Sequence, residues 1–208
     1  MGKRARREKE KESMRNEILQ AAIKIIAKEG YEKLSMRKIA DAIEYTATTI
    51  YSYYKDKAEI IDDIARQIYE KIISDAKAVL GNNDEISEDK KVGTVFKVLL
   101  YSMADCAEMG SAVIRSGTRA VFGPDSENIP PEDNGILILN DLLVQGQQKL
   151  IFRQLDENIS WMLVTALVGF ALDAIENKLH LNEEWPNLVE IYVDMLVRGI
   201  LLNKGELL

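Results

Sequence analysis

Residues 35–57 read SMRKIADAIEYTATTIYSYYKDK, and their apolar and polar pattern predicts two short helices joined by a turn. Ser35 and Thr46 precede the two helices, and each can cap free backbone amides with its side-chain oxygen. Ile39 and Ile50 fall on the inward faces, where they can hold the helices together. The segment therefore has the anatomy of a helix-turn-helix.

Helical periodicity continues on both sides of this motif. Apolar residues from Ile18 to Ile26 recur at three-and-four spacing and predict a preceding helix that ends at Gly30. Asp56 can cap a long helix that begins at Lys57. Further helices are expected at residues 92–107, 136–152, 159–178 and 183–203. No segment predicts a strand, so the expected fold class is all-α: an N-terminal three-helix helix-turn-helix domain followed by a larger helical domain.

The second helix of the motif, expected to run through Tyr53, begins with short side chains that permit close approach to a double helix. Threonine hydroxyls can bond to base edges or phosphates, and the methyl groups of Ala47 and Thr48 can touch thymine methyls. Tyr51, Tyr53 and Lys57 can reach phosphate oxygens. The candidate DNA-binding residues are Ser35, Arg37, Thr46, Ala47, Thr48, Thr49, Tyr51, Tyr53 and Lys57.

The tyrosines of this segment have a second interpretation as core residues. Three of them fall within four positions, and large aromatic side chains are often buried. We expect Tyr54 to lie in the core, while Tyr51 and Tyr53 face DNA.

Residues 18–61 resemble the DNA-binding domain of the TetR family of transcriptional regulators. The resemblance rests on I-L-x-A-A at 18–22, G-Y at 30–31, S-M-R-K-I-A at 35–40 and T-x-x-T-I-Y-S-Y-Y-x-x-K at 46–57. It implies a dimeric regulator that binds a double-stranded DNA operator. The family's common case is a repressor released from its operator by a small-molecule effector.

The chain departs from the family's pattern in two places, the turn and the position of Tyr54. The family usually has Gly-Val-Ser in the turn, where this chain has Glu44, Tyr45 and Thr46, and commonly has Phe at the position of Tyr54. Glycine suits a left-handed backbone, so Glu44 implies either a cost of roughly 1 kcal/mol or a different turn. The departure puts the base preference in question and leaves the fold unchanged.

The resemblance continues more weakly into the C-terminal part. The segment G-x-x-x-L-I-F-R-Q-L-D at 146–156 and a small-residue helix around Gly169 are similar to the family's effector-binding domain. By this analogy the last two helices pair with those of a second subunit as a four-helix bundle. The candidate interface residues are Leu163, Ala166, Phe170, Leu188, Tyr192, Met195 and Gly199, all of which also suit an intrachain core.

The same analogy places a ligand pocket among the helices of the C-terminal domain. The apolar residues that would enclose a small apolar effector are Met103, Cys106, Met109, Phe122, Leu143 and Trp161. For any single member of this set, a place in the core is the simpler interpretation.

Charge is distributed unevenly along the chain. The net charge is −7, yet residues 1–57 carry 14 Lys and Arg against 9 Asp and Glu, whereas residues 58–208 carry 13 against 25. A basic N-terminal part followed by an acidic C-terminal part is typical of a protein that binds phosphate groups with its N-terminal part. We therefore expect a DNA-binding domain at residues 1–57 and a ligand-binding and dimerisation domain at residues 58–208.

The composition also bears on localisation. Cys106 is the only cysteine, which excludes an intrachain disulfide and favours a reducing compartment. The longest uncharged apolar stretch, residues 159–172, is shorter than the roughly 20 residues that a spanning helix needs. The N-terminus mixes basic and acidic residues, unlike a secretory signal. We expect a cytoplasmic protein with no membrane partner.

Two other classes of protein fit less well. An enzyme is disfavoured because His180 is the only histidine and no glycine-rich phosphate loop follows a strand; we expect no metal and no cofactor. A membrane-surface or interaction protein would use residues 3–7 as a basic anchor, but acidic residues follow at once. We expect this segment to be a flexible arm near DNA or a disordered tail. The alternative function is that of a helical dimeric interaction protein or a cofactor-free enzyme without DNA binding.

Overall fold

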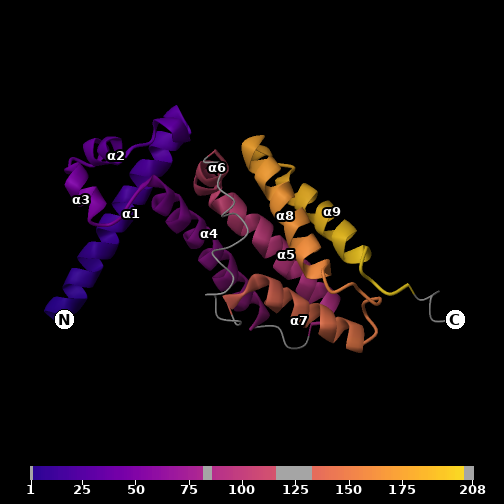
Figure 1. Cartoon of the computed structure of the whole chain (residues 1–208). Coiled ribbons are helices and arrows are strands. Elements are labelled where there is room, and N and C mark those ends of the chain that lie inside the picture. Colours follow the sequence, from indigo (N-terminus) through magenta and orange to yellow (C-terminus); the bar gives the residue numbers. More distant parts are fainter. Residues whose placement is uncertain (1, 82–85, 116–132, 204–208) are drawn as a thin grey trace. The chain divides into compact units, whose positions relative to one another are not determined.

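The computed structural model describes residues 2–81, 86–115 and 133–203 (Figure 1). Within these ranges the chain forms α-helices and short 3-10 turns, with no strand and one isolated bridge between Phe152 and Leu201. The predicted all-α class is confirmed.

The described residues form two compact units. Unit 1 contains residues 2–67 and 108–115, and unit 2 contains residues 68–107 and 133–203. The predicted domain boundary after residue 57 lies at the first residue of a long helix, α4 (Lys57–Leu80), whose first turns belong to unit 1. That boundary stays a prediction.

Unit 1 contains the predicted helix-turn-helix. Its helices are α1 (Lys3–Glu29), α2 (Met36–Ala42), α3 (Ala47–Tyr51), the start of α4 and most of α6 (Ala107–Arg115), with a 3-10 turn at Tyr31–Lys33. Ile18, Ile39, Ile50, Ile60 and Ile64 are all fully buried. Because α2 and α3 are too short to be stable alone, this shared apolar core holds them in place.

The caps expected from the sequence are present. The Ser35 side chain accepts from the amide of Lys38 at 3.2 Å, and that of Thr46 accepts from the amide of Thr49 at 3.2 Å. Asp56 accepts from the amide of Glu59 at 3.0 Å in the first turn of α4. Each cap satisfies a backbone amide that the helix itself leaves without a partner.

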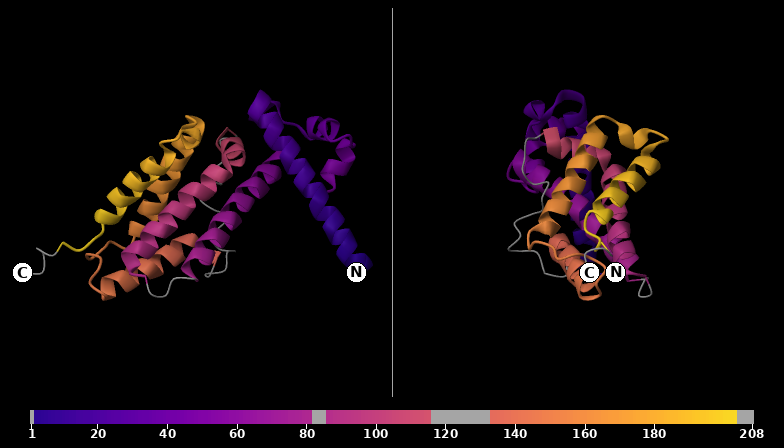
Figure 2. Two further views of the ribbon diagram at one scale, coloured as in Figure 1. Left: turned by 180° about the vertical axis from the view of Figure 1, so that it is seen from behind. Right: turned by 90° about the vertical axis from the view of Figure 1, so that its right-hand side faces the viewer.

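Two helix boundaries in unit 1 differ from expectation. The segment expected to be a flexible arm or disordered tail is helical, since α1 begins at Lys3 and its first turns project past α2 and α3 (Figures 1 and 2). Alternating charges favour such a helix, as in the ion pair between Arg6 and Glu10 at 2.8 Å. Helix α3 ends at Tyr51 rather than Tyr53, because Ser52 caps it with its amide bonded to the carbonyls of Thr48 and Thr49.

The turn between α2 and α3 has a left-handed residue. Glu44 has a φ of 61°, and the amide of Tyr45 donates to the carbonyl of Ala40 at 2.9 Å. This six-to-one hydrogen bond is that of a Schellman motif, whose left-handed position usually holds glycine. The sequence left two possibilities for Glu44, a left-handed backbone with its steric cost or a different turn. The structure shows the left-handed backbone.

Unit 2 is a helical bundle. Its helices are the end of α4, α5 (Glu88–Asp105), α7 (Gly135–Gln148), α8 (Ile159–Glu176) and α9 (Trp185–Arg198), with a 3-10 turn at Leu179–Leu181. Helix α5 packs against α7, α8 and α9, and Figure 2 shows α8 and α9 side by side. The Phe170 ring stacks on that of Tyr192 with centroids 4.1 Å apart, which joins α8 to α9.

The structure at the end of α7 explains why the segment 146–156 has a glycine at its start and why the helix stops within it. A Cβ atom on Gly146 would lie 2.1 Å from the Phe152 ring, so only glycine leaves room for this buried aromatic. The amides of Ile151 and Phe152 both donate to the carbonyl of Gly146, and Leu150 is left-handed. The chain therefore turns after Gln148 instead of continuing the expected helix to residue 152.

The end of α9 also differs from expectation. The helix stops at Arg198, not at residue 203, because the following residues pair with the segment after α7. The amide of Arg153 donates to the carbonyl of Ile200 at 3.1 Å, and the amide of Leu202 donates to that of Ile151 at 2.9 Å.

One helix of unit 2, α8, is long and apolar enough to cross a membrane by length and composition alone, with a mean hydropathy of 1.6. A core helix of a bundle passes the same test. Helix α8 packs against α5 and α7, and 39% of this apolar window is buried within the described residues.

We predict that Glu44→Gly raises the free energy of unfolding by about 1 kcal/mol, because glycine adopts the left-handed backbone without steric cost. Denaturant unfolding followed by circular dichroism measures the change. Asp41→Gly, in the exposed face of α2, is the matched control and lowers the free energy by about 1 kcal/mol. Equal losses in both variants would contradict the left-handed turn.

Candidate nucleic-acid interface

Helix α3 presents short side chains at its start. Thr46 and Thr48 are exposed, and Ala47 and Thr49 are half-buried. The hydroxyls of Thr46 and Thr49 lie 2.9 Å apart and bond to each other, and Thr46 also caps the helix. The Thr48 hydroxyl has no such bond to another described residue, so it is the hydroxyl most available to an external partner.

The three tyrosines after this helix start differ in exposure. Tyr51 is 58% exposed, Tyr53 is half-buried, and Tyr54 is 1% exposed. Tyr54 therefore belongs to the core, as expected, while Tyr51 and Tyr53 offer surface beside α3. Their contact with DNA stays a prediction.

Tyr54 is held by two charged residues from α1 and α4. Its hydroxyl donates to Asp63 Oδ2 at 2.5 Å, and Arg15 lies over its ring at 4.9 Å from the centroid. Arg15 Nε also lies 3.6 Å from Asp63 Oδ2. Burial, followed by the hydrogen bond to Asp63, raises the pKa of Tyr54, so the phenol stays protonated as a donor. A phenylalanine at this position would lack that bond.

Lys57 has a partner inside unit 1. Its ammonium group lies 4.1 Å from the centroid of the Tyr31 ring and donates to the Tyr31 carbonyl at 3.3 Å. The side chain is half-buried, so its charge is held near the α3–α4 connection instead of moving freely. The predicted contact of Lys57 with a DNA phosphate needs this fixed ammonium group to lie close to the DNA backbone.

The start of α2 supplies the other two candidates. Ser35 and Arg37 are exposed, and the Ser35 hydroxyl is already occupied as a cap. Arg37 has no ion-pair partner among the described residues, so its charge is available to an external anion.

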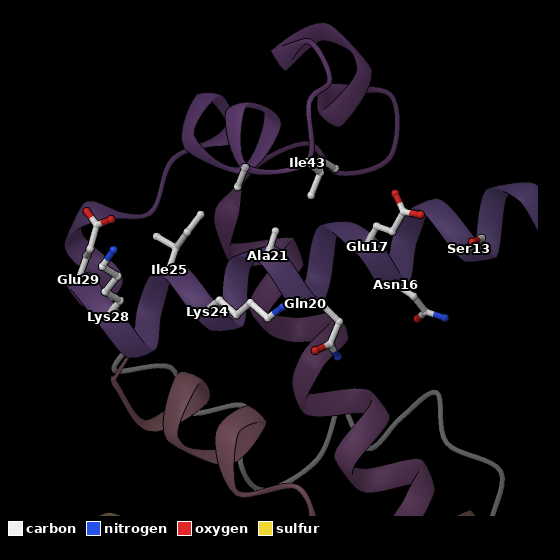
Figure 3. Close-up of a pocket in the computed structure, with 11 residues that line it drawn as sticks. Ser13, Asn16, Glu17, Gln20, Ala21, Lys24, Ile25, Lys28, Glu29 and Ile43 are labelled. Atoms are coloured by element: carbon white, nitrogen blue, oxygen red, sulfur yellow. The ribbon is translucent and has the colours of Figure 1, made fainter.

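An open groove on the same unit carries a different charge pattern. Figure 3 shows Ile43, at the end of α2, pointing toward α1, where Ala21 and Ile25 rise to meet it. The groove is also lined by Ser13, Asn16, Glu17, Gln20, Lys24, Lys28, Glu29 and Ala42. Acidic and basic side chains are mixed along it, so the groove offers no concentrated positive charge to phosphate.

Sequence reasoning missed three residues of this unit. Tyr45 is 45% exposed just before the N-cap of α3. The signal that could have identified it is an aromatic residue in the turn. The Tyr31 ring lies under the Lys57 ammonium group, and the Arg15 guanidinium lies over the Tyr54 ring. Nothing in local sequence spacing relates residues so far apart in the chain.

The candidate ligand residues do not form one set. Met103 and Leu143 are buried and Cys106 is half-buried in unit 2, whereas Trp161 is 56% exposed. Met109 belongs to unit 1, and Phe122 lies outside the described residues. The pocket therefore stays a prediction, supported best by Met103, Cys106 and Leu143.

A polar cluster lies next to Cys106 where α4 and α5 meet. Lys71 Nζ lies 2.6 Å from Asp75 Oδ2, and the buried Ser102 hydroxyl donates to the same oxygen at 2.7 Å. The Lys71 bond, then the Ser102 bond, lowers the pKa of Asp75. Burial raises the pKa of Cys106, which keeps it a neutral thiol.

The candidate interface residues of α8 and α9 divide into core and surface. Leu163 is buried, and Phe170 and Tyr192 stack on each other within the chain. Met195 and Gly199 are exposed, and Ala166 and Leu188 are half-buried. Sequence reasoning missed the exposed apolar side chains of Met162 and Ile191, and it assigned exposed Trp161 to the ligand pocket.

On α9 these residues form one stripe. Leu188, Ile191, Tyr192, Met195 and Gly199 follow spacings of three and four and so share a face. Ile191 is 60% exposed and Met195 is 57% exposed. The stripe therefore leaves apolar side chains exposed on the surface of α9, and its role as an interface stays a prediction.

Gly169 on α8 is open to solvent. A Cβ atom built there meets no other atom within 4 Å, so packing within the chain does not require glycine. Thr165 and Ala166 precede it on the same side, which makes this part of α8 a surface of small residues. Small residues permit close approach of another helix.

Among the described residues, no group of three or more His, Cys, Asp or Glu side chains is placed to bind a metal ion.

Comparison with known proteins supports the helix-turn-helix. The sequence model described as "Bacterial regulatory proteins, tetR family" matches residues 18–64. A protein of Haemophilus influenzae described as an uncharacterized HTH-type transcriptional regulator is 34% identical over 59 residues, which is 28% of this chain and 32% of that protein. The matched segment thus spans about a third of that relative.

Solved structures extend the likeness to the whole fold. A TetR family transcription regulator from Marinobacter aquaeolei is 16% identical, with a TM-score of 0.68 over 96% of this chain and 100% of that one. A TetR-family regulator from Haemophilus influenzae is 18% identical, with a TM-score of 0.65 over 92% and 98%. The fatty acid degradation regulator FadR from Bacillus halodurans is 17% identical, with a TM-score of 0.68 over 88% and 94%.

Proposed function

Residues 18–64 form a TetR-family DNA-binding domain on a chain with the fold of TetR-family transcriptional regulators, and from this premise we propose that the protein is a repressor released from its operator by a small-molecule effector. It acts in the cytoplasm on double-stranded DNA, as a homodimer and without catalysis. The alternative is a helical dimeric interaction protein or cofactor-free enzyme that ignores DNA.

The observation that carries the proposal is the exposed start of α3. Thr48 presents a free hydroxyl and a methyl group, while buried Ile50 anchors the same helix to the core. The helix is therefore rigid on its inner side and chemically available on its outer side. Such an element reads base edges in the major groove.

Basic residues around α3 supply contacts that do not depend on sequence. Arg37 is exposed at the start of α2, and Lys57 is held over Tyr31 at the start of α4. The backbone amides at helix starts add further phosphate donors.

Dimerisation would use the stripe on α9 and the small-residue surface of α8. Exposed Ile191 and Met195 leave apolar area uncovered in one protomer, and Gly169 leaves room for a partner helix. For both subunits to read one duplex, a dimer of this type would need its two copies of α3 about 34 to 36 Å apart, or a multiple of it.

The effector would enter unit 2 near Met103, Cys106 and Leu143. These side chains are apolar, and the neutral thiol of Cys106 keeps that character. Helix α4 runs without a break from unit 1 into unit 2, so an arrangement of α4 favoured by an effector changes the spacing of the two reading heads.

We predict that Thr48→Ala and Lys57→Ala weaken DNA binding in different ways. Loss of Thr48 relaxes base preference at one position of each half-site and weakens specific binding by about 1 kcal/mol. Loss of Lys57 weakens binding to all duplexes alike and lowers the salt slope by about one unit per head. Binding to specific and scrambled duplexes is measured by fluorescence anisotropy at several salt concentrations.

Thr94→Ala, a threonine of α5 in unit 2, is the control and changes neither quantity. Equal effects of the Thr48 and Lys57 changes on every duplex would contradict the assignment.

We also predict that Gly169→Leu separates the dimer while leaving the protomer folded. The added side chain meets nothing within the chain and improves helix propensity by roughly 0.5 to 1 kcal/mol, yet it fills the space that a partner helix needs. Sedimentation velocity measures the mass, and circular dichroism reports the fold. Ser74→Leu, on an exposed position of α4, is the control and stays dimeric. A dimer unaffected by Gly169→Leu would exclude this interface.

A further inference from the structure

We propose that the first turns of α1 form a rigid basic arm that contacts DNA phosphates outside the bases read by α3. This inference rests on the DNA-binding function proposed above and adds a second contact region to it. The arm consists of residues 4–13 of α1, which are exposed, and its contact residues are Arg4, Arg7 and Lys11.

These cations lie on one face of the helix. Arg4, Arg7, Lys11 and Arg15 are separated by three, four and four positions, which keeps them on one side of α1 over successive turns. The same face continues into buried Ile18 and Ala22. The stripe is thus the outward extension of the face by which α1 packs against the rest of unit 1.

Arg15 shows which way the stripe points. It lies over the ring of Tyr54, donates to its hydroxyl at 3.4 Å, and pairs with Asp63. Tyr54 follows α3 by three residues, so the stripe lies on the side of α1 that faces the α3–α4 connection. The first turns of α1 extend past α2 and α3 (Figure 2). The stripe residues of these turns, Arg4, Arg7 and Lys11, are exposed.

The other sides of the arm are electrically balanced. Arg6 forms an ion pair with Glu10 at 2.8 Å, and Lys9 lies three positions before Glu12. Glu8 is the one acidic residue beside the stripe, four positions after Arg4 and three before Lys11. In the part of the chain that the structure describes, Arg4, Arg7 and Lys11 form no ion pair. Positive charge is therefore concentrated on the stripe.

Two features of the stripe itself oppose the helix, although ion pairs on the other faces, such as Arg6 with Glu10, favour it. Arg7 and Lys11 are like charges at a spacing of four, which destabilises a helix by about 0.2 to 0.5 kcal/mol. The first turn of α1 contains basic residues and no acidic one, which opposes the helix dipole. A polyanion beside the stripe removes both costs.

The chemistry of the arm favours a nucleic acid over a lipid surface. A helix that lies on a membrane needs an apolar face opposite its basic one. From Lys3 to Ser13 the only apolar residue is Ala5, so the arm has no apolar face. Duplex phosphates need only cations at a spacing that follows the backbone.

The test compares two double variants of the full-length protein. Arg7→Gln with Lys11→Gln removes two charges from the stripe, whereas Arg6→Gln with Lys9→Gln removes two charges from the other faces of the same turns. Helix propensity is nearly equal for Arg, Lys and Gln, so both variants keep the arm helical, which circular dichroism checks.

The probe is a random-sequence duplex of about 40 base pairs, long enough to extend past two half-sites one helical turn apart. The binding constant is measured over a series of salt concentrations. The stripe variant is expected to lower the salt slope by about two units per bound head, whereas the control variant leaves it near that of the unchanged protein.

Equal slopes for both variants and the unchanged protein would overturn the arm, as would equal losses in both variants. Loss of binding to anionic lipid vesicles in the stripe variant, with the DNA slope unchanged, would also overturn it in favour of a membrane contact. If the unchanged protein fails to bind any duplex, the proposed DNA-binding function itself is wrong. That outcome is distinct from those that overturn only the arm.

Discussion

The two short helices of the head cannot stand alone, and this constraint shapes the rest of unit 1. Helices α2 and α3 contain too few residues to be stable in water, so they depend on packing against α1 and α4 through buried isoleucines and Tyr54. That packing uses the inner side of α3 completely. Its outer side, with Thr48 and Tyr51, is left for a partner.

Much of this arrangement could be predicted because it depends on local chemistry. Capping residues act within three positions, so Ser35, Thr46 and Asp56 were predictable from their own surroundings. The assignment of Tyr54 to the core is confirmed, although the residue lies beyond the end of α3. Glu44 was predictable as an anomaly, although only the structure shows that its backbone is left-handed.

Other features depend on contacts between distant residues, which no local pattern encodes. The pairing of Arg153 with Ile200 ends α9 early, and Tyr31 holds Lys57 across a large separation in sequence. The exposure of Trp161 was also unpredictable from local sequence, because an apolar residue on a helix suits a pocket, a core or an interface equally well. The arm was misjudged since its charges were read as a sign of disorder, although the same charges at helical spacing form a stripe.

Selection of bound duplexes from a random pool tests the central claim most directly, namely that an exposed, paired α3 reads DNA sequence. A dyad-symmetric site is expected, with half-sites one helical turn or a multiple of it apart, as two copies of α3 in one dimer require. Recovery of no common sequence by the intact, folded protein would contradict the account.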